Sequence, residues 1–204
     1  MPAVKKKTPR SEASRLTRDD WLDAAFTAVV DGGFDKVRVL VLAAQLGVTR
    51  GSFYWHFTDH AELVAALLGR WHEREAAAHA SLRAQSGVNA QADLERLLEA
   101  ALAHGGADLE NMRFELAMRG LGRRDADVAA LLAEVDAMRL RLFEQKFERL
   151  TGDTKTAAEL ASLFYMAIAG SMQALSRPSN PPQLKQALRG IIAHYLIHRQ
   201  APAR

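Results

Sequence analysis

The sequence predicts an all-α fold of about nine helices, in which a small N-terminal domain of three helices precedes a larger helical bundle. Apolar residues recur every three or four positions along most of the 204 residues, which is the repeat of an amphipathic helix. Breaks that contain glycine or proline separate these segments, and we find no credible strand pattern. Hydrophobic residues make up 49% of the chain, which is enough for one or two small domains with real cores.

The first helix is expected to begin near Thr17. Thr17 and Asp20 lie three residues apart and form an approximate capping box, in which each side chain can satisfy a backbone N–H of the first turn. Asp31–Gly33 supplies the stop. The inward stripe of this helix is Leu22, Ala25, Phe26, Val29 and Val30.

The segment Leu42–Phe57, LAAQLGVTRGSFYWHF, is the most informative part of the chain. It predicts a helix, a tight turn at Gly47 and a second short helix that opens at Thr49. Glycine adopts the left-handed cap conformation at no steric cost, and the Thr49 hydroxyl can accept a hydrogen bond from a backbone N–H two or three residues later. This order of elements is typical of a helix-turn-helix, which lays its second helix in the DNA major groove.

The second helix of this motif carries two kinds of side chain. Phe53 and Phe57 lie four residues apart and can pin the helix to the core. Arg50 can pair with phosphate or with guanine, and Ser52 and Tyr54 can donate to phosphate oxygens. The alternative is an αα-hairpin packed inside a helical protein, because the aromatic residues surround the helix and such a helix is usually buried.

From about residue 16 to residue 68 the chain resembles the TetR family of bacterial transcriptional regulators. The likeness rests on a first helix that ends in Gly32-Gly33-Phe34, on LAAQLGVTRGSFYWHF, and on the following Asp59, Glu62 and Leu63. It implies an all-α dimer whose N-terminal domain binds DNA and whose larger helical domain binds a small molecule and forms the dimer. Together with the motif and two flanking candidates, it gives an expected DNA-binding set of Arg38, Thr49, Arg50, Gly51, Ser52, Tyr54, Trp55, His56 and His60.

Four positions depart from the family pattern. Arg38 stands where Ser or Thr usually caps the second helix, so a cap that contributes about 1 kcal/mol is lost, although Arg38 can instead reach a phosphate. His60 replaces a common lysine, and a neutral histidine weakens that contact with the DNA backbone. Leu40 and Val41 are apolar where polar residues are usual, so they either pack under another element or form a small exposed patch.

A long helix is expected over Asp59–Ala84, and Ser86–Gly87 ends it. In the resemblance this helix connects the two domains and transmits the signal. The expected domains are a disordered basic arm (1–14), a DNA-binding domain (15–75) and a ligand-binding and dimerisation domain (76–204). The other predicted helices are Ala92–Ala103, Leu109–Leu121, Asp127–Leu150, Thr156–Leu175 and Gln183–His198.

The last two of these, Thr156–Leu175 and Gln183–His198, are the expected dimer helices. Small residues in the first allow close helix approach, and the second carries a broad apolar face. Paired with a second copy, the two would give a four-helix bundle; the alternative is an ordinary core within one chain. The two recognition helices of a homodimer would then read a palindromic DNA site at a spacing of about 34 Å, one DNA turn.

A pocket for a small-molecule effector is expected between the helices of the bundle. Methionines suit an adaptable apolar pocket, although each wall residue can equally belong to a plain core. Arg113, Glu115 and Arg119 either fix a polar group of the ligand or are solvated. The candidate wall residues are Leu97, Ala101, Met112, Leu116, Met118, Phe143, Phe147, Phe164 and Met166.

The composition narrows the classes of function. A formal net charge of +3 permits nucleic acid binding without demanding it. Basic residues crowd the N-terminal arm, which either follows the DNA backbone or serves as a solubilising tail. The absence of cysteine excludes a disulfide framework and a Cys-based zinc site. No apolar stretch approaches a membrane span, and none forms a signal peptide, so we expect a cytoplasmic protein without membrane contact.

Enzyme motifs are incomplete. His72–Glu75 begins like a zinc-protease motif, but Ala76 stands where the second histidine is needed. His194 and His198 lie four residues apart without an evident third metal ligand. We therefore expect no catalytic activity, no metal and no cofactor. The favoured function is a ligand-responsive repressor that binds double-stranded DNA. The alternatives are an activator or architectural DNA-binding dimer, and a helical small-molecule-binding protein that has lost DNA binding.

Overall fold

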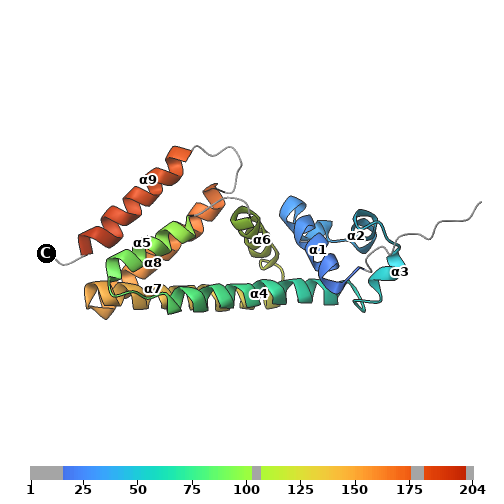
Figure 1. Cartoon of the computed structure of the whole chain (residues 1–204), viewed down its shortest axis with the longest axis horizontal. Helices are drawn as coiled ribbons and strands as arrows, with labels where there is room; N and C mark the ends of the chain where they lie inside the picture. Colours follow the sequence, from blue (N-terminus) through green and yellow to red (C-terminus); the bar gives the residue numbers. More distant parts are fainter. Residues whose placement is uncertain (1–15, 103–106, 176–181, 201–204) are drawn as a thin grey trace, which may run out of the picture.

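The computed structural model describes residues 16–102, 107–175 and 182–200, which form an elongated array of helices (Figure 1). Three helices gather at one end: α1 (Arg18–Gly32), α2 (Val39–Gln45) and α3 (Arg50–Phe53), with the single turn η1 (Phe34–Lys36) between α1 and α2. The described residues contain nine α-helices and no strand, which confirms the predicted fold class. The expected basic arm, residues 1–14, lies outside the described ranges.

The long helix α4 (His60–Ala84) runs from this group along the length of the molecule to the remaining helices (Figure 1). In the described ranges no helix is long and apolar enough to cross a membrane. The other elements are α5 (Ala90–Ala101), α6 (Ala107–Leu121), α7 (Ala126–Thr151), α8 (Thr154–Leu175), α9 (Pro182–Ile192), a π-helical turn η2 (Ala193–Ile197) and a 3-10 turn η3 (His198–Gln200).

Side-chain caps fix the starts of the two longest N-terminal helices. At α1 the Thr17 hydroxyl accepts from the Asp20 N–H at 3.3 Å, and the Asp20 carboxylate accepts from the Thr17 N–H at 2.6 Å, so the predicted capping box is confirmed. At α4 the Asp59 carboxylate accepts from the Glu62 N–H at 2.8 Å. Each cap satisfies a backbone donor that has no partner inside its helix.

The predicted hydroxyl cap of α3 is wrong. Among the described residues the Thr49 hydroxyl makes no cap bond; instead the Thr49 carbonyl accepts from the Ser52 N–H at 3.0 Å. Because α3 is a single turn, this backbone bond already closes it. Arg38 at the start of α2 turns its Nε to the Asp35 carbonyl, at 3.1 Å. Both short helices are therefore held by packing rather than by side-chain caps.

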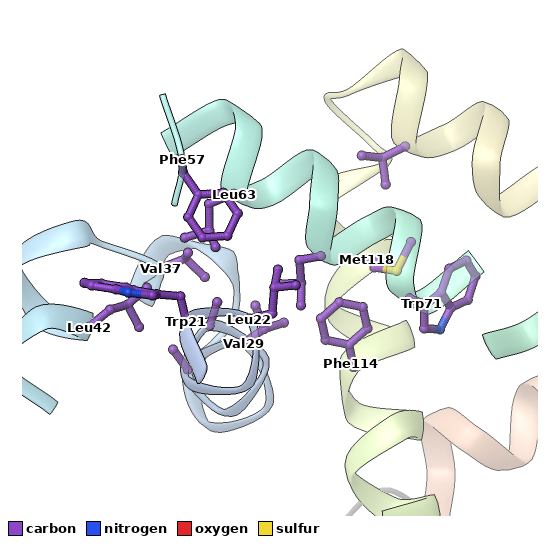
Figure 2. Close-up of a cluster of buried hydrophobic side chains, with 14 of the residues drawn as sticks. Trp21, Leu22, Val29, Val37, Leu42, Phe57, Leu63, Trp71, Phe114 and Met118 are labelled. Atoms are coloured by element: carbon purple, nitrogen blue, oxygen red, sulfur yellow. The ribbon is translucent and has the colours of Figure 1, made fainter. Parts of the chain in front are cut away.

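One hydrophobic core joins the N-terminal helices to the rest of the molecule. Figure 2 shows Phe114 and Met118 of α6 facing Leu22 and Val29 of α1, with Trp71 of α4 beside them. The Phe114 ring is fully buried and stacks on a phenylalanine ring of α1, Phe26, with centroids 5.0 Å apart. Buried residues of α7 extend the same cluster. The DNA-binding and C-terminal regions expected from the sequence thus share a core.

A second core holds α5, α7, α8 and η2 together. Phe164 of α8 lies edge-on to Phe143 and Phe147 of α7, with ring centroids 5.0 and 5.7 Å apart. Ile192 and Ile197 are buried against the same cluster. The predicted helix Gln183–His198 is divided at this point, because α9 ends at Ile192 and the chain continues as a π-helical turn. Part of the apolar face of the segment 183–198 is therefore buried against the other helices of the same chain.

Candidate functional site

The turn between α2 and α3 has the geometry that the sequence predicts. Gly47 has φ +68°, in the left-handed region, where a side chain is strained. The Val48 N–H donates to the Ala43 carbonyl at 2.9 Å and closes the turn. Leu42 and Ala43 are buried on the inner face of α2. This arrangement fixes the angle between α2 and α3.

Two phenylalanines anchor α3 to the hydrophobic core. Phe53 and Phe57 are buried and stack with their ring centroids 5.4 Å apart, and Trp21 of α1 meets Phe53 edge-on at 5.3 Å. Aromatic contacts of this kind stabilise beyond the area they bury. The anchor leaves the rest of α3 and the turn after it facing outward.

The outward face is aromatic and basic. Trp55 is 80% exposed and Tyr54 is 49% exposed, so the alternative of an entirely buried aromatic helix does not hold. Arg50 donates from Nη2 and Nε to the Tyr54 hydroxyl, at 2.8 and 3.2 Å. This pair is therefore ordered at the surface before any partner arrives. Thr49 and Gly51 are exposed beside it, and Ser52 and His56 are half-buried.

The segment that forms this face contributes no acidic side chain. The sequence has no acidic residue between Asp35 and Asp59, a stretch that includes α2 and α3. Asp35 lies 3.5 Å from Arg124 of the α6–α7 connection, and the Asp59 carboxylate caps α4. A segment that exposes arginine side chains and has no acidic residue suits a polyanion such as the DNA backbone.

The flanking candidates are more constrained. His60 at the start of α4 has Nε2 2.7 Å from the Val37 carbonyl, so this nitrogen ties α4 to the segment before α2 and only Nδ1 remains for a phosphate. Arg38 is exposed while its Nε holds the Asp35 carbonyl. Leu40 and Val41 are 65% and 43% exposed, so they form the exposed patch rather than packing beneath another element.

A cavity of about 490 Å³ lies in the other half of the molecule, enclosed by α4, α5, α6, α7 and α8. This volume falls within the range of about 300–1,000 Å³ that is usual for small-molecule sites. Most of the wall is apolar, and a few charged and polar side chains interrupt it. The charged or titratable wall residues are Arg74, Glu75, His79, Glu115, Arg139 and Tyr165.

An ion-pair network crosses the polar part of this wall. Arg139 of α7 donates to both carboxylate oxygens of Glu115, at 3.0 and 2.8 Å, and to Glu75 of α4 at 2.7 Å. Arg119 donates to Glu115 at 2.6 Å and to Asp136 at 2.7 Å. The network therefore links α4, α6 and α7 through side chains that face the cavity or lie directly behind it.

The network sets the charges of its members. Burial alone raises the pKa of Glu115, but hydrogen bonds and charges from Arg139 and Arg119 outweigh it, and the pKa lies below its ordinary value. Asp136 behaves in the same way, with Arg119 as the main opposing partner. Burial raises the pKa of Tyr165 to about 12. At neutral pH both carboxyls are thus ionised, and the phenol is neutral.

The structure brings only part of the predicted wall to the cavity. Leu97, Ala101, Met112 and Phe143 line it. Phe147 and Phe164 lie in the second core, Met118 lies in the core shared with α1, and Met166 is exposed. Leu116 is half-buried and does not line the cavity. Helical spacing identifies apolar faces, but it does not say which of two neighbouring helices a face meets.

Sequence reasoning missed five of the charged or titratable wall residues: Arg74, Glu75, His79, Arg139 and Tyr165. A signal was present for Arg139, because it follows Val135 by four residues and precedes Leu142 by three, on the inward stripe of α7. A charge on such a stripe must find partners when it is buried. The polar candidates of α6 were predicted more successfully, because Glu115 lines the cavity and Arg119 forms an ion pair with Glu115.

Large apolar side chains are exposed on the two helices expected at the dimer interface. They are Leu163 and Met166 on α8, and Ile191 and Tyr195 on α9 and η2. Exposed apolar groups on neighbouring helices mark a candidate contact surface. This surface lies at the far end of the molecule from α3 (Figure 1).

Comparisons with known proteins match the N-terminal helices in sequence. The family model described as bacterial regulatory proteins, tetR family, matches residues 22–67. Over 62 residues the chain is 42% identical to two proteins of Pseudomonas putida, the HTH-type transcriptional regulator TtgR and the probable HTH-type transcriptional regulator ArpR. The matched part spans 30% of this chain and 30% of each relative.

Solved structures extend the likeness in fold to nearly the whole chain. A transcriptional regulator from Rhodococcus sp. Rha1 has a TM-score of 0.76 at 16% identity, with 93% of this chain and 100% of that one covered. A putative transcriptional regulator from Saccharomonospora viridis, in complex with choline, has a TM-score of 0.75 at 17% identity, with 95% and 100% covered. At these identities the likeness concerns the fold alone.

Proposed function

Because the chain belongs to the TetR family of bacterial regulatory proteins, we propose that it is a sequence-specific DNA-binding transcriptional regulator, a repressor that a small-molecule effector releases from its operator. One observation carries the proposal. Phe53 and Phe57 anchor α3 and the turn after it, and these present Arg50, Tyr54 and Trp55 to solvent in a stretch of chain without acidic residues.

The roles of the exposed residues follow from their chemistry. Arg50 pairs with a phosphate or with the O6 and N7 of guanine, and the Tyr54 hydroxyl that now accepts from Arg50 donates to a phosphate oxygen. Trp55 lays its indole against the sugar or a thymine methyl group. The remaining contacts with DNA come from Thr49, Gly51, Ser52 and His56. The margin of the contact surface is formed by Arg38 and His60.

A homodimer places two such surfaces on one DNA molecule. We assign the dimer contact to α8 and α9, where Leu163, Met166, Ile191 and Tyr195 are exposed. A twofold dimer matches a palindromic operator, whose half-sites repeat with the turn of the DNA helix.

The cavity is the proposed effector site, and α4 and α6 are its connections to DNA. Glu75 of α4 and Glu115 of α6 face the cavity, while α4 begins at the DNA-binding helices and Phe114 of α6 packs on α1. An effector that prefers a different placement of these helices shifts the spacing of the recognition helices and lowers DNA affinity. The similarly folded regulator in complex with choline supports a small-molecule role for this fold.

We place the domain boundary near residues 75 and 76, inside the continuous helix α4. We propose that the protein acts by binding rather than by catalysis, without a cofactor. Because it binds DNA in this proposal, we expect the protein in the cytoplasm, the compartment that contains bacterial DNA.

The test is selection of double-stranded DNA from a random pool, followed by fluorescence anisotropy with the selected site. We expect a palindrome whose affinity falls as salt rises. Tyr54→Ala is expected to weaken binding by about 5- to 150-fold, because a contact worth about 1–3 kcal/mol is removed. Val88→Ala, at an exposed position between α4 and α5, is the control and leaves affinity unchanged. Failure to enrich any site at low salt, by a folded dimer without ligand, would overturn the DNA-binding proposal.

A further inference from the structure

The cavity has an apolar body and one charged region. Its apolar wall includes Leu82, Leu97, Leu142, Ile168 and Met172, drawn from four helices. The charged region is formed where α4, α6 and α7 meet. A ligand that fills such a site is amphiphilic, with one polar head on an apolar body.

Arg139 and Arg119, the half-buried arginines of the charged region, already hold carboxylates. Arg139 donates to both oxygens of Glu115 and to one oxygen of Glu75. Arg119 donates to Glu115 and Asp136. A ligand carboxylate or phosphate would have to displace one of these carboxylates, which would then be left as an unpaired charge in a partly buried place. The existing network thus disfavours an anionic head.

Glu75 is the wall carboxylate with acceptor capacity to spare. One oxygen accepts from Arg139 at 2.7 Å. The other lies 4.0 Å from the nearest cation, Arg74, and has no closer partner among the described residues. A carboxylate can accept about four hydrogen bonds. A cationic head can therefore be added at Glu75 without breaking any bond of the network.

Two other basic wall residues leave that oxygen without a hydrogen bond, although Arg74 forms a long ion pair with it at 4.0 Å. Arg74 donates to Asn111, and its guanidinium lies over the Phe26 ring of α1, 6.0 Å from the ring centroid. Burial lowers the pKa of His79, and the charge of Arg83 lowers it further, so this imidazole is neutral at neutral pH. Neither residue places a second positive charge on Glu75 at hydrogen-bond distance.

Aromatic residues in the same wall favour a cation as well. Phe143 and Tyr165 both line the cavity, with ring centroids 6.4 Å apart. The face of an aromatic ring attracts an organic cation that comes within about 6 Å of its centroid. Carboxylate and rings together recognise a positive head more readily than a neutral one.

We propose that the effector of this cavity is an amphiphilic organic cation, an ammonium group on an apolar body, with its head against Glu75. The inference rests on the proposed function, since it names the chemical class of the effector. A second cation at Glu75 shares its negative charge and repels Arg139, which weakens the tie between α4 and α7. α4 leads directly into the DNA-binding helices, so the same event is expected to lower operator affinity.

The test compares three ligands with the same phenylbutyl body on the full chain: 4-phenylbutylamine, 4-phenylbutanol and 5-phenylpentanoate. Binding is measured by isothermal titration calorimetry at neutral pH. We expect the amine to bind at least about tenfold more tightly than the alcohol, because charge-assisted hydrogen bonds are about twice as strong as neutral ones. The carboxylate is expected to bind most weakly.

Two substitutions on α4 locate the effect. Glu75→Gln keeps the size of the side chain and removes its charge, so the advantage of the amine over the alcohol is expected to disappear. Glu73→Gln is the matched control, because Glu73 is exposed on the same helix and does not line the cavity. It is expected to leave the binding of all three ligands unchanged.

The outcomes separate this inference from the proposed function. Tighter binding of the carboxylate, binding of none of the three, or an unchanged amine preference in Glu75→Gln would each overturn the cation assignment. Operator binding is measured on the same preparation. A protein that binds its operator but not the amine leaves the regulator proposal intact and removes only this inference. Amine binding that leaves operator affinity unchanged overturns the assignment of the cation as effector.

Discussion

Phe114→Ala is expected to destabilise the N-terminal helices although residue 114 lies far from them in sequence. Phe114 is fully buried, stacks on Phe26 at 5.0 Å and lies 5.8 Å from Phe34. Truncation of a buried phenylalanine to alanine costs about 3–5 kcal/mol, from lost burial and the cavity left behind. The close aromatic packing on both α1 and η1 favours the upper half of this range.

Urea unfolding at fixed protein concentration measures the loss. At a slope of about 2 kcal/mol per molar urea, a loss in the upper half of this range lowers the midpoint by about 2–2.5 M. Two of the three tryptophans, Trp21 and Trp71, are buried in the affected core, so their fluorescence reports it directly. Val88→Ala, at an exposed position, is expected to change stability by less than about 0.5 kcal/mol.

The reasoning would be refuted by a loss of less than about 1 kcal/mol in Phe114→Ala. Separate transitions by tryptophan fluorescence and by far-ultraviolet circular dichroism in the wild type would also contradict it. A shared core predicts that the two signals coincide, because neither half can lose its packing alone.

Three further predictions follow from single features of the structure. Gly47→Ala places a side chain at φ +68° and is expected to lower the free energy of unfolding by about 1–2 kcal/mol. Gly69→Ala, in open space on α4, is expected to raise it by about 0.5–1 kcal/mol. Thermal unfolding midpoints that shift in the same direction in both variants would contradict this. The pKa values of Glu115 and Asp136 are lowered in the folded protein, so their ionisation contributes stability that is fully present above the ordinary values of 4.5 and 3.8 and is lost as pH falls through the folded-state values. Urea titrations from pH 7 to pH 3 test this. A free energy of unfolding that rises as pH falls below 4.5 would exclude it. Met166→Glu and Ile191→Glu are each expected to convert the proposed homodimer to a monomer, as measured by analytical ultracentrifugation. Leu40→Glu, at an exposed position near α3, is expected to leave the homodimer intact. A homodimer that persists in both interface variants would show that α8 and α9 do not form the contact.

Local signals in the sequence were sufficient for the helix-turn-helix. A capping box at Thr17, a left-handed glycine at Gly47 and two phenylalanines four residues apart each act within a few residues, so their effect can be predicted without knowing the rest of the fold. The Thr49 cap failed for a local reason too, since a four-residue helix closes through its backbone carbonyl.

The cavity was harder to predict because it depends on which helices meet. Phe147, Phe164 and Met118 have the apolar character of a pocket wall, yet their neighbours fill the space around them. Arg139 and Glu75 face each other across α7 and α4, 64 residues apart in sequence, and helical periodicity does not pair residues on different helices. Their charges on inward faces were the available clue, and only the packing shows how they are satisfied.

The central claim is that two copies of the α3 surface bind one DNA molecule as a pair. Hydroxyl-radical footprinting on the selected operator tests it most directly. The account predicts two protected segments related by twofold symmetry, with centres separated by one helical turn of about 10 base pairs or a whole multiple of it, and loss of both in Tyr54→Ala. A single protected segment, or protection that Tyr54→Ala leaves unchanged, would contradict the claim.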